Sequence, residues 1–194
     1  MQRVGLPSVI VLAVFSWLLL VAPALAAPHV DGFADVPWGA NVDQLKAVMD
    51  QRGATLQKQG PDRVEYLGTF ANEPARLIFY FDKNIFYQGE AELLNAKGKD
   101  EPVIKKYFEE FSNMVTAKYG NAEPGGSVGQ FQVYANLWRN LPTAAQPAAQ
   151  AGISVVGIVD VRKKPDPNKA ENKVIISYSV GLDWARAQTL PKDI

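Results

Sequence analysis

The chain has 194 residues, with 20 basic and 20 acidic side chains and a formal net charge of zero at pH 7. This balance does not favour nucleic acid or an anionic membrane surface as a partner, so we expect neither. The absence of cysteine excludes disulfides, a thiol nucleophile and cysteine-based metal sites. A chain of this length can bury enough apolar surface to fold without covalent cross-links.

The N-terminus has the pattern of an export signal. Arg3 precedes an uncharged apolar run at residues 9–21, and small residues follow up to Ala26. The run is too short to span a bilayer comfortably. We therefore predict a signal peptide at 1–26 and a mature domain at 27–194, in the periplasm or secreted and without a membrane span. An uncleaved N-terminal anchor is the alternative.

The first predicted element of the mature chain is a helix over residues 42–52. Asn41 stands at the N-cap position and Gln44 three residues later, where the two side chains can satisfy each other's backbone donors. Trp38 and Gly39 come directly before this start. We interpret them as folding residues, an apolar plate and a turn, with ligand stacking by Trp38 as the alternative. Apolar residues recur at helical spacing, namely Val42, Leu45, Val48 and Met49.

Three strands are predicted next, over residues 63–70, 75–81 and 85–93, because apolar and polar side chains alternate in each. The short links at 71–74 and 82–84 carry turn residues. We therefore expect an antiparallel meander.

A longer amphipathic helix is predicted over residues 102–119. Acidic residues precede it, Pro102 suits its first turn, and Gly120 suits its end. Its broad apolar face has to be covered, and a sheet is the natural partner. The apolar residues of this face are Val103, Ile104, Tyr107, Phe108, Phe111, Met114, Val115 and Tyr119.

Three further strands are predicted over residues 130–139, 153–162 and 173–180, because all three segments are rich in β-branched and aromatic residues. The uncharged segment 140–152 between the first two is either a binding loop or a hairpin tip. The predicted fold class is α+β, with two helices packed on one face of an antiparallel sheet in the order α-β-β-β-α-β-β-β.

Four short motifs of the chain resemble a pattern found in small exported bacterial domains of uncharacterised function. The resemblance covers nearly the whole mature chain. It departs from the pattern at Asn41, where such domains usually have Ser or Thr, and in the longer loop at 140–152. The motifs are Pro37-Trp38-Gly39-Ala40-Asn41, Tyr80-Phe81-Asp82-Lys83-Asn84, Lys118-Tyr119-Gly120 and Leu137-Trp138.

At the level of fold, the predicted arrangement also resembles the β-lactamase-inhibitor protein and the small lipoprotein of the outer-membrane barrel-assembly machinery. Both of these proteins work by binding other proteins. The resemblance implies a binding role, although fold alone does not assign a function.

Few residues in the chain carry chemistry. His29 is the only histidine and lies near the predicted new N-terminus, so we expect it to be inert. By strand alternation Glu90 and Glu92 face the same side of the sheet, and we expect Asp160 as a further carboxylate on a neighbouring strand. Alternating glutamates are typical of a solvated sheet face, and we predict no catalytic, cofactor-binding or metal-binding residue.

Surface aromatics remain as candidates for partner binding. If Leu137 and its alternating neighbours face the helix, then Tyr134 and Trp138 face outward beside Arg139, and such residues are enriched in binding hot spots. The alternative register buries Trp138.

The main hypothesis is a non-enzymatic, exported module that binds an envelope or secreted protein or a peptide with the uncovered sheet face. A carrier that holds a small apolar ligand between helix and sheet is the first alternative. A carboxylate-dependent hydrolase is the second.

Overall fold

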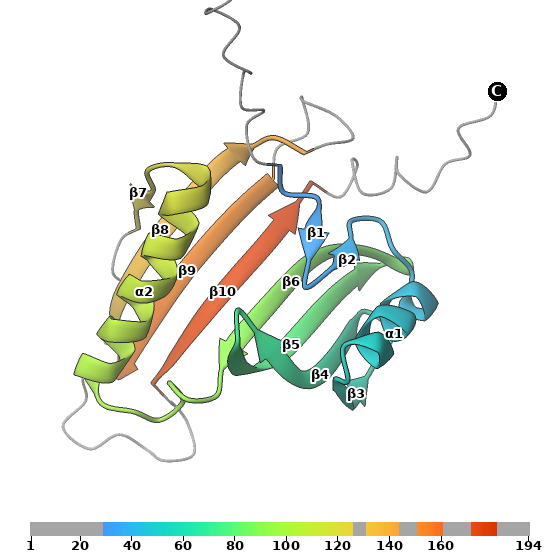
Figure 1. The fold of residues 1–194 in the computed structure, drawn as a ribbon, viewed down its shortest axis with the longest axis horizontal. Coiled ribbons are helices and arrows are strands. Elements are labelled where there is room, and N and C mark those ends of the chain that lie inside the picture. The colour runs from blue at the N-terminus through green and yellow to red at the C-terminus, as the bar shows by residue number, and fades with distance from the viewer. Residues whose placement is uncertain (1–28, 126–130, 144–150, 161–171, 182–194) are drawn as a thin grey trace, which may run out of the picture.

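The computed structural model describes residues 29–125, 131–143, 151–160 and 172–181 (Figure 1). The predicted signal peptide and the middle of the predicted loop at 140–152 lie outside these ranges. The helices are α1 (Val42–Gln51) and α2 (Glu101–Tyr119). The strands are β1 (Gly32–Phe33), β2 (Val36–Pro37), β3 (Thr55–Gln59), β4 (Arg63–Phe70), β5 (Glu73–Asp82), β6 (Ile85–Leu93), β7 (Glu123–Pro124), β8 (Phe131–Leu141), β9 (Ala151–Asp160) and β10 (Lys173–Val180).

Strands β3 to β10 form one antiparallel sheet in the order β3-β4-β5-β6-β10-β9-β8-β7, and β1 and β2 form a separate hairpin. Helix α1 precedes β3 to β6 and α2 precedes β7 to β10, so the described chain forms two units of one helix and four strands (Figure 1). The units join where their last strands, β6 and β10, pair with Ile176 opposite Ala91. The architecture is α+β and mostly sheet.

The α+β class is confirmed, but the predicted order of elements is wrong. The structure adds β3, β7 and the hairpin β1–β2 to the predicted helices and strands. All five side chains of β3 are exposed, so no buried face requires apolar residues at alternate positions. Its sequence TLQKQ accordingly shows no alternation of apolar and polar residues. The other three strands have two residues each, which is too short to show a period.

Three tight turns set the hairpins of the N-terminal unit. Ala34 and Asp35 join β1 to β2, and both have positive φ angles, 49° and 65°. The same pattern recurs at Ala71 and Asn72 between β4 and β5, and at Lys83 and Asn84 between β5 and β6. Two successive left-handed residues match the twist of antiparallel strands, and Asn and Asp tolerate that conformation.

The predicted start of the first helix is confirmed. The Gln44 backbone N–H donates to Asn41 Oδ1 at 2.9 Å, and the Asn41 backbone N–H donates to Gln44 Oε1 at 2.9 Å. The side chain of Asn84, from the β5–β6 turn, accepts a further bond from the Val42 N–H at 3.2 Å. The helix start is thus tied to the sheet as well as capped.

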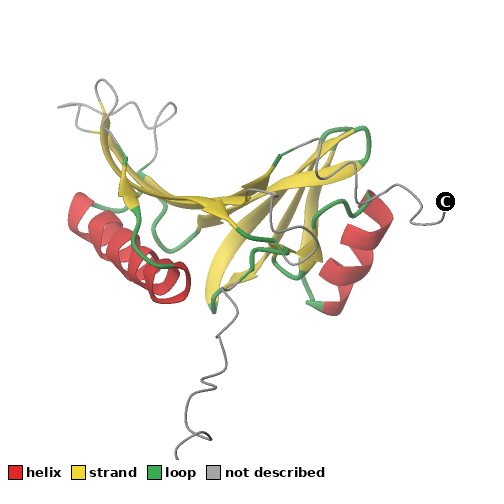
Figure 2. Ribbon diagram, turned by 90° about the horizontal axis from the view of Figure 1, so that it is seen from above, coloured by secondary structure: helices red, strands yellow, loops and turns green. Residues whose placement is uncertain are grey.

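The core lies on one face of the sheet, and both helices pack against this face (Figure 2). Gly157 of β9 allows α2 to approach, because a Cβ there would lie 3.1 Å from Ile104 Cγ2. No described helix covers the other face (Figure 2). Buried side chains of the covered face are Val64, Tyr66, Ala75, Leu77, Phe79, Ala91, Leu93, Ile153, Val155, Val159, Val174 and Ile176.

The hairpin β1–β2 covers the part of the sheet between α1 and α2 (Figure 1). Its Phe33 is 2% exposed and lies directly on Gly89 of β6. The Phe33 ring contacts Phe79 at 5.5 Å, Phe70 at 5.4 Å and Tyr178 of β10 at 5.6 Å between ring centroids. One side chain of the hairpin therefore packs against residues from both units.

Trp38 is a folding residue, as predicted. Its ring is 4% exposed and stacks on Phe86, with the ring centroids 5.1 Å apart. The indole Nε1–H donates to the Val30 carbonyl at 2.8 Å. Gly39 has φ 83°, and its N–H bonds to the Phe86 carbonyl at 2.9 Å, so the turn after Trp38 is fixed to β6.

We predict that Gly89→Ala lowers the free energy of unfolding by about 1–3 kcal/mol or more, because the new methyl group would overpack the core. A Cβ at position 89 would lie 2.2 Å from Phe33 Cδ1. Gly152→Ala is the matched control in the same sheet, since its nearest contact would be an ordinary 3.7 Å. Urea unfolding measures both, and equal stability of the two variants would contradict the packing described.

Candidate functional site

The residues predicted for partner binding lie on different faces of the sheet. Trp138 pairs with Ile153 and Tyr134 pairs with Gly157, which places both aromatic side chains on the face that α2 covers. Trp138 is 2% exposed, whereas the side chain of Arg139 is 62% exposed and lies near Glu123. The register that would expose Tyr134 and Trp138 together is therefore not the one adopted. A partner-binding role for these residues stays a prediction.

Both aromatic residues are tied to α2. The Trp138 Nε1–H donates to the Gly120 carbonyl at the end of the helix at 2.8 Å, and the Tyr134 hydroxyl donates to Glu101 Oε1 at its start at 2.5 Å. This bond to Glu101 raises the pKa of Tyr134. The two contacts fix both ends of α2 on β8.

We predict that Trp138→Ala lowers the free energy of unfolding by about 3–5 kcal/mol, because it leaves a cavity under the end of α2. The neighbouring substitution Arg139→Ala should change it by no more than about 0.5 kcal/mol, since an exposed ion pair contributes little. Thermal or urea unfolding of the two single variants tests this, and a larger loss for Arg139→Ala would contradict the observed register.

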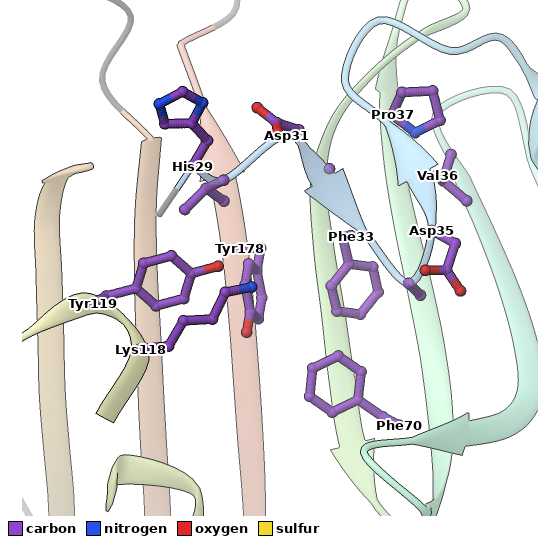
Figure 3. Close-up of a pocket in the computed structure, with 13 residues that line it drawn as sticks. His29, Asp31, Phe33, Asp35, Val36, Pro37, Phe70, Lys118, Tyr119 and Tyr178 are labelled. Carbon is purple, nitrogen blue, oxygen red and sulfur yellow. The ribbon is translucent and has the colours of Figure 1, made fainter. Parts of the chain in front are cut away.

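A groove lies on the covered face, between the hairpin β1–β2 and the C-terminal end of α2 (Figure 3). Its main hollow has a volume of about 440 Å³. A second hollow of about 310 Å³ shares Ala34, Asp35, Phe70, Lys118, Tyr119 and Tyr178 with it. The two hollows therefore adjoin each other, and together they are called the groove below.

Aromatic rings form the apolar part of this groove. Phe33, Phe70 and Tyr178 contact one another, and the Phe70 and Tyr178 ring centroids are 6.1 Å apart. Phe70 also stacks on Phe111 of α2 at 6.2 Å. Of the three, Phe33 is fully buried, whereas Phe70 and Tyr178 are half-buried. The groove thus offers exposed ring surface on a rigid support.

Three hydrogen-bond donors stand on the α2 side of the groove. The Lys118 ammonium lies 4.9 Å from the centre of the Tyr119 ring, and Figure 3 shows Lys118 and Tyr119 reaching toward Tyr178. Neither hydroxyl nor the ammonium has a hydrogen-bond or ion-pair partner within the described ranges. Burial raises the pKa of Tyr178, so its hydroxyl stays protonated and able to donate.

On the hairpin side of the groove, the carboxylate of Asp35 is neutralised. It forms an ion pair with Arg52, which follows α1, and Arg52 also donates to the Thr69 carbonyl at 3.0 Å. His29 and Asp31 line the opposite end of the hairpin wall (Figure 3). On the wall that faces Lys118, the Asp35 carboxylate is therefore already paired with a cation.

The open face of the sheet carries the predicted carboxylates. Glu90 and Glu92 lie on β6 opposite residues of β10 and β5, and both point away from the helices. Asp160 is on β9, which pairs with β8 and β10 and not with β6, so the expectation that it neighbours the glutamates is wrong. Glu92 is 8% exposed and has Arg76 at 3.9 Å.

Glu90 differs from Glu92 because neutral groups hold its carboxylate. The Tyr80 hydroxyl donates to Glu90 Oε2 at 3.0 Å, and Gln88 Nε2 donates to Oε1 at 3.0 Å. In the described part of the chain no cation lies within ion-pair distance of Glu90. Burial and the adjacent Glu90 charge raise the pKa of Tyr80 to about 12.

Beside Glu90 the open face is hollowed, and further along it is apolar. The hollow has a volume of about 320 Å³ over β8 to β10, where the side chains are short: Gly152, Ser154, Ser177 and Ser179. Leu137 and Gln88 form parts of its rim. The apolar side chains next to it are half-buried, and they are Val133, Ala135, Leu137, Val156, Ile158 and Ile175.

Within the described ranges, no cluster of His, Cys, Asp and Glu has the geometry of a metal site. No described helix is both long and apolar enough to cross a bilayer. Comparisons with models of protein families, with curated proteins and with solved structures find no match to this chain. The groove and the open face are therefore interpreted from their own geometry.

We predict that the free energy of unfolding falls as the pH rises from about 10 to about 12, in part through Tyr80, because its folded-state pKa is raised above that of an unfolded chain. Neutral Tyr80 contributes stability below this window and loses it on ionisation beside Glu90. Urea unfolding at about pH 9 and about pH 11 should show a smaller loss for Tyr80→Phe than for the wild type. Equal losses would contradict the assigned cause.

Proposed function

We propose that the protein is an exported, non-enzymatic module that binds a protein or peptide of the cell envelope on the open face of its sheet. Export rests on the predicted signal peptide at 1–26. The observation that supports the binding role is Glu90, a carboxylate that forms no ion pair with a described residue and lies opposite Ser177 at the border of a hollow.

A carboxylate held only by neutral donors leaves its negative charge available to a partner. Keeping such a group half-buried costs stability, because desolvation disfavours the charged form. A lysine or arginine side chain from a partner would compensate that charge and form a charge-assisted hydrogen bond. We therefore propose that the partner presents a basic residue to Glu90.

The surroundings of Glu90 suit an extended or flat partner surface better than an enclosed small molecule. The short side chains of Ser154, Ser177 and Ser179 leave room for one partner side chain beside Glu90. The half-buried apolar residues of β8 to β10 can then cover an apolar neighbour of that basic residue. An arginine of the partner would suit this position, since arginine is one of the residue types enriched in binding hot spots.

The proposal is tested by selecting peptides from a displayed random library on the protein, expressed from the full 194-residue chain. We predict that peptides selected on the wild type are enriched in Lys or Arg next to an apolar residue. Glu90→Gln should lose the basic enrichment and weaken a selected peptide about tenfold, since one charged hydrogen bond is lost. Glu109→Gln on α2 carries the same charge change on the other side of the sheet and should have no effect.

The outcomes separate the role from the site. If no peptide is selected above background, the binding role is wrong. If peptides bind equally well to the wild type and to Glu90→Gln, the protein binds peptides but the open-face site is wrong.

A further inference from the structure

The groove on the covered face has a composition different from that of the open face. Aromatic rings form its floor, and Lys118 and Tyr119 at the end of α2 and Tyr178 of β10 supply donors. Its volume of about 440 Å³ falls in the range of small-molecule sites. This face is separated from Glu90 by the thickness of the sheet, so a ligand here does not depend on partner binding there.

The donors of the groove define the polar end of a ligand. Lys118, Tyr119 and Tyr178 supply an ammonium and two hydroxyls, and none of the three groups forms a hydrogen bond or an ion pair with a described residue. All three can donate to an oxyanion, and the ammonium adds a compensating charge. Of the two carboxylates that line the facing wall, Asp35 is paired with Arg52 and Asp31 lies at the other end of the wall, and neither forms an ion pair with Lys118.

The rest of the groove defines an apolar end. From the donors, the groove continues past the rings of Tyr178 and Phe70 toward Ala34 and Met114, and these side chains offer apolar surface beside the Asp35–Arg52 ion pair. An acyl chain laid along these rings would bury apolar area on both the hairpin and α2. The groove is open along its length and does not require a compact ligand.

We infer that this groove binds a single-chain amphiphile with an anionic head, whose head lies at Lys118, Tyr119 and Tyr178 and whose acyl chain lies over Phe70 toward Met114. A free carboxylate and a phosphate ester share this head chemistry. The two sources are distinguished by the choice of probe.

The experiment measures binding of dodecanoate, dodecyl phosphate and dodecanol, each below its micelle-forming concentration, to the protein expressed from its full chain. Isothermal calorimetry should show one dodecanoate or dodecyl phosphate per chain, and the tighter of the two identifies the head group. Dodecanol, which has the same chain without the charge, should bind at least about tenfold more weakly. Inorganic phosphate alone should not bind measurably, since it lacks the chain.

Variants of the head site assign the contact. Lys118→Met should weaken the charged probe about tenfold and leave dodecanol unchanged within about twofold. Tyr119→Phe keeps the ring and removes one donor, and it should weaken the charged probe by a smaller factor. Lys106→Met is the matched control, because Lys106 is on the same helix but is paired with Glu110.

Three results would overturn the inference. They are no saturable binding of either charged probe, equal binding of dodecanol and dodecanoate, and an equal effect of Lys118→Met and Lys106→Met. None of these results bears on peptide binding to the open face.

Discussion

The contact between Phe33 and Gly89 is the constraint on which the rest of the structure depends. Two helices do not cover the apolar face of a sheet of eight strands, and the hairpin β1–β2 covers the part between them. Phe33 can lie flat on β6 only because Gly89 has no side chain. The same ring contacts Tyr178 of the C-terminal unit, so this packing also holds the two units together. It also forms the floor of the groove, which ties the site to the stability of the core.

The two faces of the sheet use their polar groups differently. On the covered face, Tyr134 and Trp138 bond to the two ends of α2, and their polar atoms serve the fold. Lys118 and Tyr178 on the same face form no hydrogen bond or ion pair with a described residue. On the open face, Glu90 accepts hydrogen bonds from neutral groups but forms no ion pair with a described residue. Polar groups that a fold leaves unpaired while satisfying their neighbours are expected at functional positions.

The sequence predicts the elements whose physics is local. The capping box at Asn41 and the turn residues act over a few residues, and the structure has both. The predicted alternation of β6 holds for Gly89, Ala91 and Leu93 but not at its start, where Phe86 is buried beside a shift of register. The register of β8 is different, because both of its faces carry apolar side chains and alternation cannot say which face meets α2. Edge strand β3 has no buried side chain, so no pattern in its sequence marks it.

The candidate sites show the same limit. Strand periodicity predicts that Glu90 and Glu92 share a face. Only the structure shows that Glu92 has Arg76 beside it, whereas Glu90 forms no ion pair with a described residue. The groove brings together residues of β1, β4, α2 and β10. No motif marks such a site, because its parts are far apart in the chain and Phe33, Phe70 and Tyr178 read as ordinary core aromatics.

The irregular edge strand β3 has a consequence for how other chains can approach. Its pairing with β4 shifts register between Leu56 and Lys58, and its five exposed side chains include a lysine, two glutamines and a threonine. A bulge and a charged side chain at a sheet border hinder the docking of another strand. At this border the sheet therefore resists extension by a strand of a second copy and the aggregation that would follow.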